Sequence, residues 1–130
     1  MAIKKHQRLN IKEITLNSGN GDFYLLFNQF LNDFYHADGK TKQFLIEEEP
    51  LTSSLQPKER CLLAATARQL AVDFNLSIPT WIDKPIYFTT SPIYAFNSKD
   101  KKFQEYLIET SLTEFKRHGL YLGGNILERV

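Results

Sequence analysis

The spacing of phenylalanines between residues 22 and 36 constrains the fold of this chain more than any other feature. They recur at intervals of four, three and four residues, which places them on one side of an α-helix. They are Phe23, Phe27, Phe30 and Phe34. An aromatic stripe of this kind is typical of a helix that packs against its own core rather than of a ligand-binding wall. We therefore predict a helix over residues 22–36 with buried phenylalanines, and Asp38 and Gly39 as its stop.

Residues 57–75 carry a second apolar stripe with the same four-three-four spacing. It consists of Leu63, Ala67, Leu70 and Phe74. Apolar residues occupy another side of this segment as well, and its alanines are short enough to let neighbouring helices approach closely. Pro57 stands where a proline is tolerated, in the first turn. We predict that this is the central helix of the fold, covered on more than one face.

Shorter helices are predicted at residues 41–49 and 99–110, each with apolar side chains on an inward face. The inward residues are Phe44 and Leu45 in the first helix, and Phe103, Tyr106 and Leu107 in the second. Glu114 follows Ser111 by three residues, which is the spacing of a capping box. This pair predicts a last short helix, which Gly119 is expected to end.

Residues 76–97 differ from the rest of the chain because prolines interrupt them too often for a long helix or a central strand. The segment is predicted to form loops and short turns. Its large aromatic residues are Trp81, Tyr87, Phe88, Tyr94 and Phe96. Rigid aromatic side chains on a proline-stiffened segment are typical of a pre-organised binding surface, so we predict that these five residues contact a partner. The alternative is that the same aromatics cover the core and the prolines stiffen a connection.

Composition favours one helical domain. The chain has 130 residues, of which 42% are hydrophobic and 24% are charged, and no low-complexity stretch divides it. We predict an all-α fold, formed by a single compact multi-helix domain over residues 1–130. Residues 1–21 are expected to form an N-terminal arm and loop, and the proline- and aromatic-rich segment connects the later helices.

Charge and hydropathy exclude several classes of protein. Sixteen basic and fifteen acidic side chains leave a net charge of +1, so the basic footprint of a dedicated nucleic-acid binder is absent and nucleic acid is not expected as a partner. A basic arm that includes Lys4, Lys5 and Arg8 keeps a DNA-binding regulator open as an alternative. No apolar run is long enough to span a membrane, and residues 1–20 lack the apolar stretch of a signal peptide. We expect a cytoplasmic protein without a membrane partner.

Sequence motifs for catalysis or for cofactors are missing. The chain has neither a glycine-rich phosphate loop nor a nucleophile elbow, and we predict no catalytic residues and no cofactor. Cys61, the single cysteine, lies among alanines and leucines, which favours a small core residue over a nucleophile. Asp33, His36 and Asp38 come nearest to a metal constellation. Ordinary roles of such residues at a helix end are more common, so no metal is predicted.

A competing hypothesis is an enzyme or a small-molecule binder whose pocket the fold assembles from dispersed polar residues. The residues considered for such a pocket are Asp33, His36, Arg68, Asp73 and His118. We prefer the interpretation that this protein is not an enzyme, and an enzyme remains the alternative.

Residues 62–130 resemble the tail of an uncharacterised bacterial all-helical family. The resemblance is carried by Leu63-Ala64, Leu70-Ala71, Ile78-Pro79-Thr80-Trp81, Pro92, Phe115, Arg117-His118-Gly119 and Leu127-Glu128-Arg129-Val130. In that family the tail is similar to an all-helical module that occurs behind helix-turn-helix domains or near nucleotidyltransferase-type toxins. The resemblance therefore implies a helical fold and a toxin–antitoxin context. It implies no catalytic residues, and the phenylalanine-rich front of this chain departs from the family.

These observations lead to one functional hypothesis and two alternatives. We expect a non-catalytic protein-interaction or regulatory domain, antitoxin-like in its role, whose partner is another protein such as a toxin or a regulator. The alternatives are the enzyme or small-molecule binder and the DNA-binding regulator.

Overall fold

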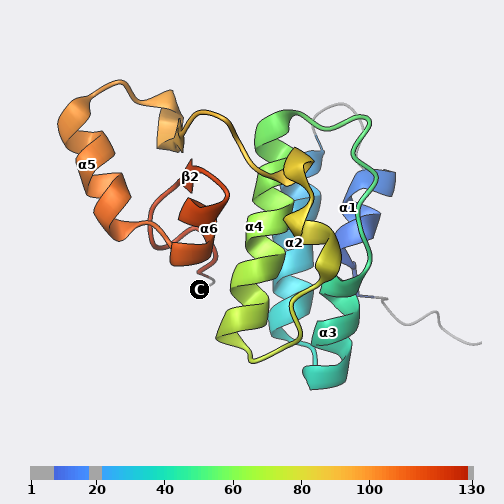
Figure 1. The fold of residues 1–130 in the computed structure, drawn as a ribbon. Helices are drawn as coiled ribbons and strands as arrows, with labels where there is room; N and C mark the ends of the chain where they lie inside the picture. The colour runs from blue at the N-terminus through green and yellow to red at the C-terminus, as the bar shows by residue number, and fades with distance from the viewer. Residues whose placement is uncertain (1–7, 18–21, 129–130) are drawn as a thin grey trace, which may run out of the picture. The chain divides into compact units, whose positions relative to one another are not determined.

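The structure is a computed structural model that describes residues 8–17 and 22–128 (Figure 1). These residues are mostly helical, which confirms the all-α prediction. Contacts between residues divide the chain into two compact units, residues 1–51 and 52–130. The single domain over residues 1–130 stays a prediction. The predicted loop at 18–21 and the basic residues Lys4 and Lys5 lie outside the described residues.

The first unit is built around the phenylalanine stripe. Its helices are α1 (Ile11–Asn17), α2 (Phe23–Tyr35) and α3 (Gly39–Glu47), and each contacts the other two (Figure 1). All four phenylalanines of the stripe are buried, as predicted. Ile11 and Ile14 of α1 are buried as well. Burying one side chain of this size contributes about 1.5–3 kcal/mol, so the α2 stripe is a large part of the core of this unit.

The predicted stop at Asp38 and Gly39 is wrong: α2 ends at Tyr35 with His36 as its C-cap, whereas Asp38 is the N-cap of α3 and Gly39 its first residue. The Asp38 carboxylate accepts a hydrogen bond of 2.8 Å from the backbone N–H of Thr41, which lowers the pKa of Asp38 and caps α3.

The inward face of α3 differs from the prediction: Leu45 and Ile46 are buried, whereas Phe44 is 55% exposed. Successive residues on a helix point about 100° apart, so Phe44 and Ile46 cannot both face the same core.

Helix α4 (Pro57–Asp73) is the central element of the second unit, as predicted. Every residue from Cys61 to Ala71 is buried, so this part of the helix is covered on more than one face, as predicted. It begins with Pro57, and the Glu59 carboxylate accepts a hydrogen bond of 2.9 Å from the backbone N–H of Gln56. The helix ends at Asp73, which leaves Phe74 at its C-terminal cap and 38% exposed instead of in the buried stripe.

The proline-rich segment forms short turns, as predicted. They are η1 (Thr80–Asp83) and η2 (Pro85–Tyr87), which are single 3₁₀ turns, and η3 (Ala95–Asn97), a turn in which Phe96 and Asn97 have left-handed backbones. Strand β1 (Ile93–Tyr94) pairs in parallel with strand β2 (Leu120–Tyr121). η1 and η2 lie against α4, so this segment covers the central helix (Figure 1).

The chain ends with α5 (Lys101–Thr110), α6 (Thr113–Arg117) and β2. Figure 1 shows α5 on the other side of β2 and α6 from α4, and α5 contacts β2. Leu107 is the buried residue of α5, whereas Tyr106 is 58% exposed, contrary to the prediction. A narrow contact with a two-residue strand buries less of a helix than a full core face would.

The predicted capping box at Ser111 is wrong. Leu112 occupies the N-cap position of α6, and the hydroxyl of Ser111 instead accepts a hydrogen bond of 2.9 Å from the backbone N–H of Gly123. Gly119 follows α6 with φ +86°, a left-handed conformation that favours glycine, and so ends the helix as predicted.

Within residues 8–17 and 22–128, no helix combines the length and the apolar character that crossing a membrane would require.

Candidate functional site

The five aromatic residues predicted to contact a partner differ in their burial. Trp81 and Tyr87 are buried, and their rings meet edge to face with centroids 5.0 Å apart. They belong to η1 and η2, which lie against α4. For these two residues the structure agrees with the alternative interpretation, in which the aromatic segment covers the core.

Phe88 and Tyr94 are half-buried and each stacks on another ring. Phe88 lies on the imidazole of His118 with ring centroids 4.3 Å apart and planes 15° from parallel. Tyr94 stacks on Tyr121 at 5.3 Å, across the β1–β2 pair. Both side chains therefore have one face engaged inside the second unit, and the exposed remainder is small.

Phe96 is the exception, because 91% of it is exposed. It is the most exposed of the large apolar side chains in the described part of the chain. Its backbone is left-handed, with φ 59° and ψ 18°, and Asn97 follows with φ 52°. Asparagine adopts this conformation readily, but for a phenylalanine it costs about 1–2 kcal/mol. Phe96 therefore combines an exposed aromatic ring with a strained backbone.

Two of the dispersed polar residues considered for a pocket, Arg68 and His118, meet inside the second unit. Arg68 lies on α4, and His118 follows α6 and is fully buried. The guanidinium Nε–H of Arg68 donates a hydrogen bond of 3.1 Å to Nε2 of His118. Another nitrogen of Arg68 pairs with the carboxylate of Asp83, a residue that the sequence analysis did not single out.

The partners of His118 define its tautomer. Nδ1 lies 2.7 Å from the backbone carbonyl oxygen of Tyr87, which can only accept, so Nδ1 carries the proton. Nε2 is then the acceptor for Arg68. Burial lowers the pKa of His118, which keeps the ring neutral. Because both ring nitrogens are hydrogen-bonded to protein groups, neither is free to exchange a proton with a substrate. The contacts among Asp83, Arg68 and His118 link α4 to η1 and to the residue after α6.

Asp73 lies in a separate contact. Its carboxylate accepts a hydrogen bond of 2.9 Å from the side-chain amide of Gln69, whose oxygen accepts one of 3.2 Å from the backbone N–H of Glu114. This pair joins α4 to the start of α6, whereas the hydrogen-bond partners of His118 are Arg68 and Tyr87.

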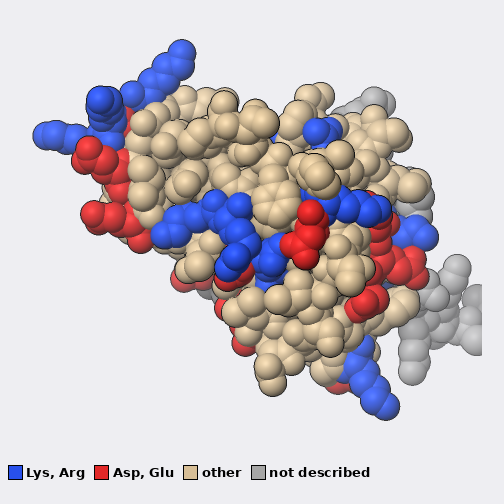
Figure 2. Space-filling model, in the orientation of Figure 1, with Lys and Arg blue, Asp and Glu red and all other residues tan. Residues whose placement is uncertain are grey.

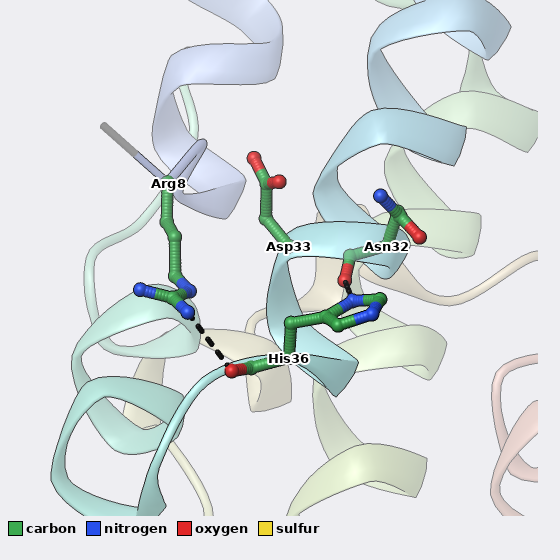
Figure 3. A pocket seen from close by; sticks show the side chains of 4 residues that line it. All are labelled: Arg8, Asn32, Asp33 and His36. Atoms are coloured by element: carbon green, nitrogen blue, oxygen red, sulfur yellow. Dashed lines mark hydrogen bonds between the residues drawn. The ribbon is translucent and has the colours of Figure 1, made fainter. Parts of the chain in front are cut away.

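Asp33 and His36, the other two dispersed residues, line a pocket in the first unit together with Arg8 and Asn32 (Figure 3). The pocket has a volume of about 290 Å³. Arg8 donates a hydrogen bond of 2.9 Å to the carbonyl oxygen of His36, and Asp33 accepts one of 2.9 Å from the backbone N–H of Leu9. These bonds attach the segment before α1 to the end of α2.

The same pocket contains the pair considered for a metal. Nδ1 of His36 lies 2.8 Å from the carbonyl oxygen of Asn32, so this nitrogen is already used as a donor. Asp38, the third residue of the sequence pattern, caps α3 and is not part of the lining. Among the residues that the structure describes, no group of three or more His, Cys, Asp or Glu side chains is placed to hold a metal ion.

Cys61 is buried in α4, as predicted. Burial raises the pKa of its thiol to about 11, so the sulfur is protonated at neutral pH. A protonated, enclosed thiol is a core side chain and not an activated nucleophile.

Comparisons of the chain with protein-family models, with curated proteins and with solved structures found no match.

Proposed function

We propose that this chain is a non-catalytic protein-interaction domain and that Phe96 is the centre of its contact surface. The observation that carries the proposal is the 91% exposure of this phenylalanine on a left-handed backbone. Covering a phenylalanine ring with a partner contributes about 1.5–3 kcal/mol, and a buried aromatic anchor of this kind is typical of interface hot spots. A strained residue persists only where the surrounding structure holds it in place, and such residues concentrate at functional sites.

The chain around Phe96 is held by contacts on both sides, which supports the proposal. On the N-terminal side, the backbone N–H of Ile93 donates to the carbonyl oxygen of Gly119 at 2.9 Å, and β1 pairs with β2. On the C-terminal side, the backbone N–H of Ser98 donates to the carbonyl oxygen of Ala95 at 3.2 Å. An anchor that is already ordered loses little conformational entropy when it binds, and this favours recognition.

The partner that we propose is another protein, a toxin or a regulator, with this chain in an antitoxin-like role in a bacterial cell. The resemblance of residues 62–130 to the bacterial all-helical tail motivates that choice of partner. The enzyme alternative has less support, because His118 and Cys61 are both withdrawn from chemistry by their surroundings. The DNA-binding alternative relies on the basic arm, most of which lies outside the described residues.

Affinity capture from the source cell with three versions of the full chain tests the proposal. The versions are the wild type, Phe96→Ala and the control Phe44→Ala, which removes a phenylalanine that is 55% exposed on α3. We expect at least one protein to be captured by the wild type and the control and lost with Phe96→Ala. A set of captured proteins that does not change with Phe96→Ala would contradict the proposal.

A further inference from the structure

We infer that the partner segment that covers Phe96 is an acidic peptide segment with a large apolar side chain. This inference depends on the proposed function, because it specifies the chemistry of the partner at the same surface. It starts from the charges that follow Phe96 in the chain, at the beginning of α5.

The first turn of α5 and the residue before its cap carry a basic cluster. The cluster consists of Lys99, Lys101 and Lys102, and all three side chains are exposed. The exposed carboxylate of Asp100 lies between them, so the three lysines outnumber one acidic group. None of the three lysines forms an ion pair with any residue between 8 and 17 or between 22 and 128. Figure 2 shows basic side chains projecting from this end of α5, with acidic side chains farther along. The cluster is therefore available to carboxylates from outside the chain.

The order of charges along α5 opposes the helix macrodipole. The first turn has lysines and no acidic residue, and the exposed Glu105 and Glu109 lie toward the other end. The N-terminus of a helix carries a partial positive charge, so each lysine there is unfavourable. Asp100 at the N-cap provides one favourable negative charge but forms no capping hydrogen bond with its side chain, so the lysines are only partly offset. Carboxylates from a partner would remove this repulsion, which gives an acidic segment a specific gain at this place.

Phe96 and the basic cluster are close enough in the chain for one short peptide to contact both. Lys99 is three residues from Phe96, a separation of at most about 11 Å along the chain. Lys101 and Lys102 follow at once in the first turn of α5. An extended peptide of about six to eight residues spans about 20–28 Å and covers both features. Its apolar side chain would lie on Phe96 and its carboxylates over the lysines.

The same features favour a peptide over a nucleic acid. Glu105 and Glu109 are exposed on the helix beyond the basic cluster, where they would repel a phosphate backbone that continued along α5. The net charge of the whole chain is only +1. A peptide can limit its acidic residues to the part that faces the lysines, whereas a nucleic acid carries a charge at every nucleotide.

Selection from a displayed library of random peptides against the full chain tests the inference. We expect the selected peptides to be rich in Asp and Glu and to contain a large apolar residue. Their affinity for the double variant Lys101→Glu, Lys102→Glu should fall at least about tenfold, and that loss should shrink at high salt. The matched control is Lys40→Glu with Lys58→Glu, which makes the same change of charge in the first turns of α3 and α4. It should leave the affinity unchanged.

Phe96→Ala and Phe44→Ala separate the two proposals. The inference would be wrong, and the proposed function would stand, if the selected peptides lost affinity for Phe96→Ala but were not acidic. The same would hold if they bound the variant Lys101→Glu, Lys102→Glu as tightly as the wild type. Selected peptides of which none depends on Phe96 would contradict both proposals.

Single-stranded oligo(dT) is the nucleic-acid probe. If its binding required Phe96 and the α5 lysines, the partner would be a nucleic acid and not an acidic peptide. Circular dichroism of each variant confirms that it is folded.

Discussion

Arg68 and His118 are hydrogen-bonded through Nε and Nε2 at 3.1 Å, although fifty residues separate them in the sequence. Their contact is the middle of a chain of interactions that runs from the Asp83 carboxylate through Arg68 and His118 to the carbonyl oxygen of Tyr87. These contacts attach α4 to η1, to η2 and to His118, the residue that follows α6. The Arg68–His118 hydrogen bond requires a neutral imidazole, because a proton on Nε2 would leave that nitrogen unable to accept from Arg68.

The first prediction is that the protein loses stability as the pH falls below about 6.5 because of His118. Burial lowers the folded-state pKa of His118 below its ordinary value of 6.5, so the unfolded chain takes up a proton that the folded chain excludes. The contribution of His118 is complete above that value and is lost as the pH falls toward the folded pKa. Urea unfolding between about pH 7.5 and pH 5.5 should show a falling midpoint.

His118→Asn provides the comparison, because it keeps a donor for Tyr87 but does not titrate. Its unfolding midpoint should be lower at neutral pH and should change less between the two pH values. His36→Asn removes an exposed histidine from the first unit and should keep the wild-type dependence. If His118→Asn kept the full dependence on pH, the role assigned to His118 would be wrong.

The second prediction concerns Gly119. Alanine there would have a strained backbone at φ +86°, and its Cβ would collide with Oγ1 of Thr89 and approach Cβ of Thr89 to 3.3 Å. Gly119→Ala should therefore reduce the free energy of unfolding by at least about 1–2 kcal/mol from backbone strain alone. Thr89→Ala removes the colliding oxygen, which has no hydrogen-bond partner in the described structure.

A double-mutant cycle measures this collision. Thr89→Ala combined with Gly119→Ala should be more stable than the sum of the single changes predicts, whereas Thr89→Ser, which keeps Oγ1, should give no such recovery. Strict additivity in both combinations would show that Gly119 and Thr89 are not in contact.

The third prediction separates the buried and exposed parts of the aromatic segment. Tyr87→Ala should reduce the free energy of unfolding by about 3–5 kcal/mol, because it leaves a cavity against Trp81 and α4. Phe96→Gly should change it by less than about 1 kcal/mol, since relief of the left-handed strain offsets the greater entropy of the unfolded chain. Thermal unfolding followed by circular dichroism measures both. A stability loss at Phe96 as large as that at Tyr87 would mean that Phe96 packs against the fold.

The fourth prediction tests the two apolar stripes. Phe30 and Leu70 are fully buried, one in each unit. Replacing either by alanine should reduce the free energy of unfolding by about 2–5 kcal/mol through lost transfer energy and the remaining cavity. The exposed Leu25, which is 69% accessible on α2, is the control, and Leu25→Ala should stay within about 0.5 kcal/mol of the wild type. Unchanged urea midpoints for Phe30→Ala and Leu70→Ala would show that the stripes are not core.

The sequence by itself determined the elements whose signals are local. The phenylalanine period predicted α2, Pro57 and the leucine period predicted α4, and the prolines predicted the short turns between Thr80 and Asn97. Each of these signals acts between residues a few positions apart, where side-chain spacing and backbone sterics decide the outcome. The order of charges along α5 is local in the same sense and can be read without a structure.

Tertiary structure decided which side chains those elements buried and which they brought together. Phe44 and Tyr106 lie on helices that were predicted, yet both are exposed, because the surface that each helix packs against is set by other segments. The bond between Arg68 and His118 and the exposure of Phe96 on a left-handed backbone have no local signal. The Arg68–His118 bond joins residues that are fifty positions apart and forms only after the helices have packed. The exposure of Phe96 depends on which other segments pack beside it, and a one-dimensional pattern does not contain that information.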